Sequence, residues 1–234
     1  MFNWLHLSDN ELQALSLSLN IALRSVVFNL PFAIALAWLL TRKRFAGRIL
    51  VDTLVHLPLV LPPVVIGYLL LLLLGVHGAI GSWLLQHFDM RLAFTRNGAA
   101  LATAVMSLPL MVRSIRIALA GVDRGLEDAA RTLGAHPLDR FCSITLPLML
   151  PGVLAGVITG FAAGLGEFGA VITFAGNVPG ETQTLALALY SALQLPNGEQ
   201  VATHLASISI VLGIVGLLLA ELLARALHRK LGQQ

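Results

Sequence analysis

Five long apolar stretches constrain this chain more than any other feature. A helix rises about 1.5 Å per residue, so crossing a hydrocarbon core of about 30 Å takes about 20 residues. The stretches cover roughly 15–40, 54–74, 99–120, 148–175 and 205–223. Only 12% of the 234 residues are charged, and the mean hydropathy is +0.84, so too few charges exist to cover a water-exposed globule. The sequence therefore predicts an all-α integral membrane protein with five core spans.

Polar and helix-breaking residues interrupt three of these stretches. They are Arg24, Asn29 and Pro31 in the first, Pro58, Pro62 and Pro63 in the second, and Arg113 and Arg116 in the third. The last two indicate that the end of the third span leaves the lipid. A sixth apolar piece, Thr184 to Leu195, is too short to cross and is expected to form a re-entrant or interfacial helix. We expect a single membrane domain over 1–234, with five spans and room for a sixth helix.

The basic residues are distributed unevenly among the loops. Twelve of the fifteen lie after the first span, after the third span with its flanks, or in the C-terminal tail. Because basic residues concentrate in cytoplasmic loops, we expect a multi-pass protein of a bacterial inner membrane, with the N-terminus external and the C-terminus cytoplasmic. Arg44 and Arg140 would then be cytoplasmic, and Asp89 and Glu199 external. Residues 1–20 carry no Lys or Arg, so the first stretch is predicted to stay as a span rather than be cleaved as a signal peptide.

Several functions are disfavoured by the residues that the sequence lacks. A Walker ATP site needs Gly-Lys followed by Ser or Thr, and neither Lys43 nor Lys230 follows a glycine. The histidines show no metal-ligand spacing, and Cys142 is the only cysteine. A net charge of +3 with two lysines is not a nucleic-acid footprint. We therefore expect no catalytic residue, metal or cofactor in this chain and no nucleic-acid partner; if its function uses ATP and Mg, a separate subunit has to bind them.

The longest cytoplasmic loop, 121–148, is polar yet has a helical pattern of its own. Its apolar stripe recurs at spacings of three and four and consists of Val122, Leu126, Ala129, Ala130 and Leu133. On another face, Glu127 and Arg131 lie four apart and can pair. Gly134 is expected to end this helix and Pro137 to open a second short one. The stripe either packs on the protein's own spans or the lipid surface, or docks in a groove of a cytoplasmic partner.

A longer motif in the same loop favours docking. Asp128-Ala129-Ala130, three residues, Gly134, nine residues and Ile144-Thr145-Leu146-Pro147 resemble the EAA signature of ABC importer permeases, E-A-A-x3-G-x9-I-x-L-P. Asp128 in place of the first Glu is the only departure. In that family the loop, here about 121–147, forms the coupling helix that contacts the ATP-binding subunit. The resemblance implies a coupling role for ten residues: Glu127, Asp128, Ala129, Ala130, Arg131, Leu133, Gly134, Ile144, Leu146 and Pro147.

Two further segments are similar to the molybdate branch of these permeases. They run from His56 to Leu71 and from Leu165 to Tyr190, and the likeness extends over nearly the whole chain. The resemblance implies the transmembrane domain of a type I ABC importer. It also implies a homodimer in membrane lipid, two ATP-binding subunits and an external solute-binding protein that delivers molybdate or tungstate.

Candidates for a gate or pathway come from two places in the spans. They are Glu167, Gly166 and Gly169 in the fourth stretch and Pro62 and Pro63 in the second. A carboxylate within a span costs roughly 2.5–3.5 kcal/mol, so Glu167 should face protein or water and serve a structural or gating role. The prolines form either a bend near the gate or ordinary kinks. Gly160 and Gly164 fit close helix packing, either static or sliding between two states.

Other polar residues carry weaker expectations. Arg24 either attracts an oxyanion or snorkels to the interface, and His56 and His204 are expected to be polar anchors near span ends. The outer loop 176–203 either contacts a binding protein or is a generic turn. Two rival functions remain: a permease for sulfate, thiosulfate or another solute, and, from a different class, a membrane-embedded enzyme that uses Glu167 and His56.

Overall fold

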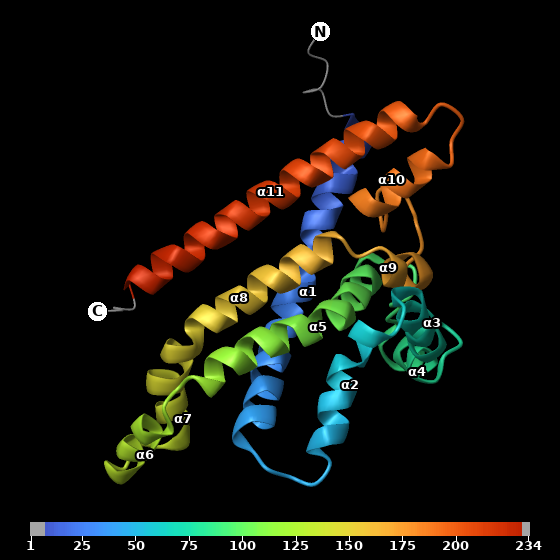
Figure 1. Cartoon of the computed structure of the whole chain (residues 1–234). Coiled ribbons are helices and arrows are strands. Elements are labelled where there is room, and N and C mark those ends of the chain that lie inside the picture. Colours follow the sequence, from blue (N-terminus) through green and yellow to red (C-terminus); the bar gives the residue numbers. More distant parts are fainter. Residues whose placement is uncertain (1–7, 231–234) are drawn as a thin grey trace.

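The structure is a computed structural model that describes the backbone of residues 8–230 and the side chains up to 216, with those of 218 and 222. Every regular element in this part of the chain is helical (Figure 1). In chain order the elements are α1 (Asp9–Arg42), α2 (Arg48–Val60), α3 (Pro63–Leu74), α4 (Ala79–Phe88), α5 (Arg96–Ala120), α6 (Arg124–Thr132), α7 (Pro137–Arg140), the π-helix η2 (Phe141–Thr145), α8 (Leu146–Leu165), α9 (Gly169–Phe174), α10 (Leu185–Leu193) and α11 (Glu199–Lys230). The basic side chains of the tail, Arg225, Arg229 and Lys230, lie outside the described side chains.

Helix α1 is continuous despite the polar residues within it. Its 34 residues extend over about 51 Å, longer than a hydrocarbon core. Ser8 and Glu11 form a capping box that satisfies the first backbone N–H groups. The amide of Asn29 is buried and donates to the carbonyl of Ala104 at 2.7 Å and to the hydroxyl of Ser107 at 3.1 Å. This polar contact ties α1 to α5, so Asn29 does not break the span.

Helices α1, α5 and α8 pack side by side and form the centre of the molecule (Figure 1). Glycines of α8 recur every four residues along the contact, at Gly152, Gly156, Gly160 and Gly164. A Cβ on Gly160 would lie 2.7 Å from Cγ of Met111, and one on Gly164 would lie 2.9 Å from Cγ2 of Thr103. The backbones therefore approach too closely for a side chain, which confirms the expected close packing and extends it by two glycines.

The second predicted span is not one helix. It is divided at 61–62 into α2 and α3, whose axes are bent by 117°. Pro62 and Pro63 explain the position of the break, because neither can donate the backbone hydrogen bond that a continuous helix would need. Pro63 instead occupies the first turn of α3, where the missing donor costs nothing.

The fourth predicted span is also interrupted. Helix α8 ends at Leu165, residues 166–168 are non-helical, and α9 is a six-residue helix. The expectation of a continuous stretch to residue 175 is therefore wrong. The sixth apolar piece forms α10, nine residues long and too short to cross, as predicted. Four helices are long and apolar enough to span a membrane among the described residues, or five if α2 and α3 together form a broken span.

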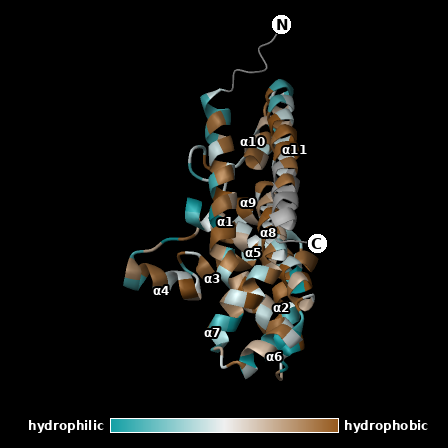
Figure 2. Ribbon diagram, turned by 90° about the vertical axis from the view of Figure 1, so that its left-hand side faces the viewer, coloured by the Kyte–Doolittle hydropathy of each residue, from teal (hydrophilic) through white to brown (hydrophobic). Residues whose placement is uncertain are grey.

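Hydrophilic residues gather at the end of the molecule formed by α6 and α7, whereas the long helices are mostly hydrophobic (Figure 2). Many large apolar side chains of these helices are exposed, including Val27 at 64%, Leu72 at 53% and Ile210 at 62%. Such a surface suits lipid rather than water. The end of α1, the start of α2 and the α6–α7 segment share the lower end of the view in Figure 1, opposite the start of α1 and the α10–α11 turn.

Candidate functional site

The segment between α5 and α8 folds as the loop pattern predicts. Asp123 caps α6 by accepting the N–H of Gly125 at 2.8 Å, and Pro137 opens α7. Gly134 has a φ of +86°, and the N–H groups of Gly134 and Ala135 donate to the carbonyls of Arg131 and Ala130 at 3.1 and 3.0 Å. These two bonds form a Schellman motif, so Gly134 ends the helix as expected. We call 121–147 the coupling segment.

The apolar stripe of the coupling segment divides in two. Val122 is buried against the ends of α1 and α5, but Leu126 is 48% exposed and Leu133 is 88% exposed. Leu138 of α7 adds a third apolar side chain at 67% exposure. Asp128, Ala129 and Arg131 are exposed as well. Most of the stripe therefore has no cover among the residues that the structure describes, so the alternative in which it packs on the protein's own spans does not fit.

A buried ion pair attaches the coupling segment to α1. The guanidinium of Arg42 donates to Oε1 of Glu127 at 2.9 Å and to the carbonyl of Val122 at 3.2 Å. The hydroxyl of Thr145 donates to the same carboxylate oxygen at 2.9 Å. The expected pairing of Glu127 with Arg131 is therefore wrong, and Arg131 instead lies 4.0 Å from Asp128 on the exposed side. The sequence did not indicate Arg42 as the partner of Glu127, because 85 residues separate the two.

The end of the motif joins the coupling segment to α8. Ile144 lies in the π-helix, and Leu146 and Pro147 are the first residues of α8. Phe141 and Leu146 pack against the buried cluster that holds Leu119, Val122 and Met149. The coupling segment is thus attached to two long helices, to α1 through the ion pair and to α8 through the chain itself.

The structure brings two of the five gate candidates, Pro63 and Gly169, into contact, and the other three, Pro62, Gly166 and Glu167, lie in the same two helix breaks. A Cβ on Gly169 would lie 2.7 Å from Cβ of Pro63, so the break between α8 and α9 packs on the break between α2 and α3. The Glu167 carboxylate accepts the N–H of Ala170 at 2.9 Å and caps the short helix α9. This contact ties Glu167 to the start of α9, and Gly166 lies beside it in the same break.

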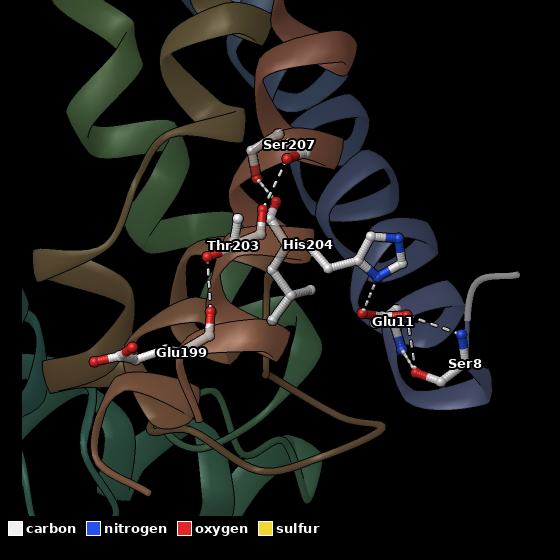
Figure 3. Close-up of polar contacts among 8 residues, drawn as sticks. Ser8, Glu11, Glu199, Thr203, His204 and Ser207 are labelled. Atoms are coloured by element: carbon white, nitrogen blue, oxygen red, sulfur yellow. Dashed lines mark hydrogen bonds and ion pairs between the residues drawn. The ribbon is translucent and has the colours of Figure 1, made fainter. Parts of the chain in front are cut away.

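The three isolated polar candidates each have a local partner. Arg24 is exposed and donates to Asn97 at 2.9 Å. His204 contacts the Glu11 carboxylate at 2.7 Å and so joins α11 to the start of α1 (Figure 3). His56 lies 3.2 Å from Asp52 and faces a cavity with several arginines, a grouping that the sequence analysis missed. The sequence signal that could have revealed this grouping is the pair Arg113 and Arg116 at the end of the third predicted span. No group of three metal-binding side chains occurs in the described residues.

The loop between α9 and α10 is held by its own side chains. The amide of Asn177 donates to Ser191 at 2.7 Å, and Gln183 donates to Asn177 at 3.0 Å. Gly176 and Gly180 both have a φ of +76°, which favours glycine at these two turns. Arg96, at the start of α5, donates to the carbonyl of Gly180. The loop is therefore an ordered surface rather than a loose connection.

Comparison with known proteins places this arrangement in a family. The model for the binding-protein-dependent transport system inner membrane component matches residues 29–230. The chain is 53% identical over 227 residues to the molybdenum transport system permease protein ModB of Escherichia coli (strain K12), covering 97% of this chain and 99% of that one. It is 39% identical over 189 residues to the sulfate transport system permease protein CysT of the same strain, covering 80% of this chain and 68% of that one.

Solved structures share the fold at low sequence identity. A bacterial ABC transporter involved in import of the polysaccharide alginate superposes with a TM-score of 0.76 at 20% identity, covering 94% of this chain and 80% of that one. The MetNI methionine ABC transporter superposes with a TM-score of 0.69 at 16% identity, covering 94% of this chain and 99% of that one. The match over most of the chain shows that this protein belongs to the family of inner membrane components of binding-protein-dependent transport systems.

Proposed function

We propose that this chain is the membrane-spanning permease of an ATP-driven importer that carries molybdate or tungstate into the cytoplasm. The observation that carries the proposal is the 53% identity, over 97% of this chain, to a permease of molybdenum transport. The resemblance to a sulfate permease is lower, at 39% over 80% of the chain. Sulfate or thiosulfate is therefore the second candidate substrate.

The assembly that we propose contains two copies of this permease domain, two ATP-binding subunits and an external binding protein. The coupling segment supplies the cytoplasmic docking element, since Leu126, Leu133 and Leu138 are exposed around Gly134. The basic-residue distribution supports a cytoplasmic position for this end, with the N-terminus external. ATP and Mg bind the partner subunit, and its closure shifts the permease between two states.

The gate in this proposal lies where the two helix breaks meet. Short helices and non-helical backbone at membrane depth are tolerated where protein or a cavity surrounds them. Pro63 and Gly169 lie at this contact, and Pro62, Gly166 and Glu167 belong to the same two breaks. A rearrangement of α3 against α9 would open or close the path without unwinding a long helix.

Uptake by vesicles tests the substrate. The vesicles contain this chain, its ATP-binding subunit and its own binding protein, and uptake of labelled molybdate and sulfate is compared. We expect ATP-dependent molybdate uptake that tungstate competes. Sulfate uptake at an equal or greater rate, without competition by tungstate, would sink the assignment to molybdate.

Substitution of Gly134 tests the docking role. Nothing lies within 4 Å of a Cβ placed there, so Gly134→Val acts through its φ of +86°, which a β-branched residue resists. We expect transport and co-purification of the ATP-binding subunit to be lost while membrane insertion persists. Gly134→Asn should retain more activity because asparagine tolerates this conformation. Gly121→Val, at an ordinary φ of −78°, is the matched control. Normal transport and assembly in Gly134→Val would argue against docking.

A further inference from the structure

A cavity of about 530 Å³ opens between the ends of α1, α2 and α5. Its basic lining comes from Arg48 and His56 of α2 and Arg113 and Arg116 of α5, and we call these four residues and their cavity the basic pocket. Leu40 and Thr41 close it on the side of α1. A second cavity of about 360 Å³, lined also by Asp52, adjoins it and shares His56 and Arg116. Both lie toward the end of the molecule that carries the coupling segment.

The basic pocket has more positive charge than its acidic neighbour neutralises. Arg116 donates to Oδ1 of Asp52 at 2.6 Å, and His56 lies 3.2 Å from the same oxygen. Arg48 and Arg113 make no ion pair or side-chain hydrogen bond with any residue whose side chain the structure describes. Three guanidinium groups thus face one carboxylate, which leaves two positive charges without a partner among the side chains that the structure describes.

Snorkelling does not account for this arrangement. A basic side chain that reaches the interface alone needs no particular neighbour. Arg113 instead lies about two turns before the end of α5 and faces the same cavity as Arg48, which begins α2. Arg44 is the contrast, since it lies at the same end of the molecule and is exposed, as Arg113 is, but lines neither cavity. Unpaired like charges that converge from two helices repel one another unless an anion or water lies between them.

We propose that the basic pocket binds a tetrahedral oxyanion through Arg48, Arg113 and Arg116. Guanidinium groups suit such an anion because they donate paired hydrogen bonds. The cavity exceeds the volume of one anion many times over, given about 30 Å³ per water, so the bound anion keeps part of its hydration shell. Binding is then weak, as release at the end of a pathway requires.

Two sources can supply this anion. One is the transported oxyanion as it leaves toward the cytoplasm, and this source rests on the proposed function. The other is the phosphate group of an anionic lipid at the same membrane face. Both present the same tetrahedral group to the arginines. The test therefore compares samples with and without the anionic lipid.

The test measures binding to the complex of the permease with its ATP-binding subunits, without the external binding protein. Labelled molybdate and phosphate are titrated in detergent by equilibrium dialysis for the wild type, Arg113→Gln, Arg113→Lys and Arg44→Gln. We expect Arg113→Gln to weaken binding about 10-fold, as loss of a charge-assisted hydrogen bond does. Arg113→Lys should keep part of the affinity, and Arg44→Gln should match the wild type. Because the ATP-binding subunits are the same in every sample, differences report the basic pocket.

The lipid source is tested in nanodiscs. Phosphatidylglycerol that remains bound to the wild type in native mass spectrometry, blocks molybdate binding and is lost in Arg113→Gln supports the site with a lipid phosphate as its occupant. Equal binding of molybdate, phosphate and phosphatidylglycerol by Arg113→Gln and Arg44→Gln would overturn the site, even if vesicle uptake of molybdate is normal. Conversely, anion binding that depends on Arg113, in a transporter that moves no molybdate, would refute the proposed function and leave the site in place.

Discussion

The two ends of α1 are fastened in the same way to parts of the chain that come much later. At one end Arg42 pairs with Glu127 of the coupling segment at 2.9 Å, and at the other Glu11 contacts His204 of α11 at 2.7 Å. In both contacts one partner is nearly buried, with side-chain exposures of 8% for Arg42 and 8% for Glu11. The difference lies in the basic partner, because arginine always carries a charge whereas histidine can also contact a carboxylate as a neutral donor.

This comparison indicates different tasks for the two contacts. The Arg42 contact is permanent and lies beside the surface proposed to dock the ATP-binding subunit, so it suits the transmission of force. The Glu11 contact is reinforced locally, since Ser8 also donates to that carboxylate through its N–H and its hydroxyl (Figure 3). Removing one partner of the contact should therefore lower the stability of the protein more at the Arg42 end than at the Glu11 end.

Glu127→Ala should have the largest effect. It leaves the buried Arg42 guanidinium without a carboxylate, and breaking such a pair costs about 3 kcal/mol. We expect a lower melting midpoint of the detergent-solubilised transporter and loss of molybdate uptake. Asp128→Ala is the stability control, because its 4.0 Å contact with Arg131 is 71% exposed on both sides. Equal melting midpoints for the two variants would contradict the role assigned to the ion pair.

His204→Ala should have a smaller effect at the opposite end. Glu11 loses one partner but keeps both hydrogen bonds from Ser8, so we expect a cost of about 1–2 kcal/mol. The melting midpoint measures this cost. His87→Ala is the control, since that imidazole is exposed and its contacts, with the carbonyl and the ring of Trp83, stay within its own helix. If the melting midpoint falls as far in His204→Ala as in Glu127→Ala, the two ends of α1 do not differ in the way proposed.

Ser18→Ala tests a neutral contact near the His204 end. The hydroxyl of Ser18 accepts the N–H of Leu185 at 2.7 Å and so anchors the start of α10 to α1. Without it a buried N–H is left unpaired, at a cost of about 1 kcal/mol. Ser16→Ala removes an exposed hydroxyl that bonds only within α1, so its melting midpoint should equal that of the wild type. Indistinguishable midpoints for both variants would show that α10 is held by packing alone.

Arg24→Gln should have the smallest effect. Its contact with Asn97 is exposed, and exposed contacts of this kind contribute less than about 1 kcal/mol. We expect an unchanged melting midpoint and an unchanged rate of molybdate uptake. A clear fall in uptake with normal stability would revive the hypothesis that Arg24 attracts the oxyanion.

Local patterns predicted much of this molecule. Apolar length identified the long helices, and the spacing around Gly134 predicted the end of α6 and the start of α7. The proline pair was recognised as a place for a bend. Its angle of 117° was not predictable, because it depends on how α3 packs against α9.

Contacts between distant segments could not be predicted in this way. Glu127 was paired with its helical neighbour Arg131, but a buried partner 85 residues away competes better for the carboxylate. The basic pocket was missed for the same reason, because Arg48 and Arg113 meet only when α2 folds back beside α5. The interruption after Leu165 was missed because the apolar residues continue on both sides of Gly166 and Glu167, so the sequence was taken as one stretch.

The contact between the two helix breaks also limits which amino-acid substitutions this protein can accept during evolution. A Cβ on Gly67 would lie 2.7 Å from the carbonyl oxygen of Ala170, just as one on Gly169 would meet Pro63. A single replacement at either glycine therefore needs a backbone shift in the opposite segment. Among descendants of this protein, residues 62–67 and 166–170 should change in concert or not at all, although almost a hundred positions separate them in the gene.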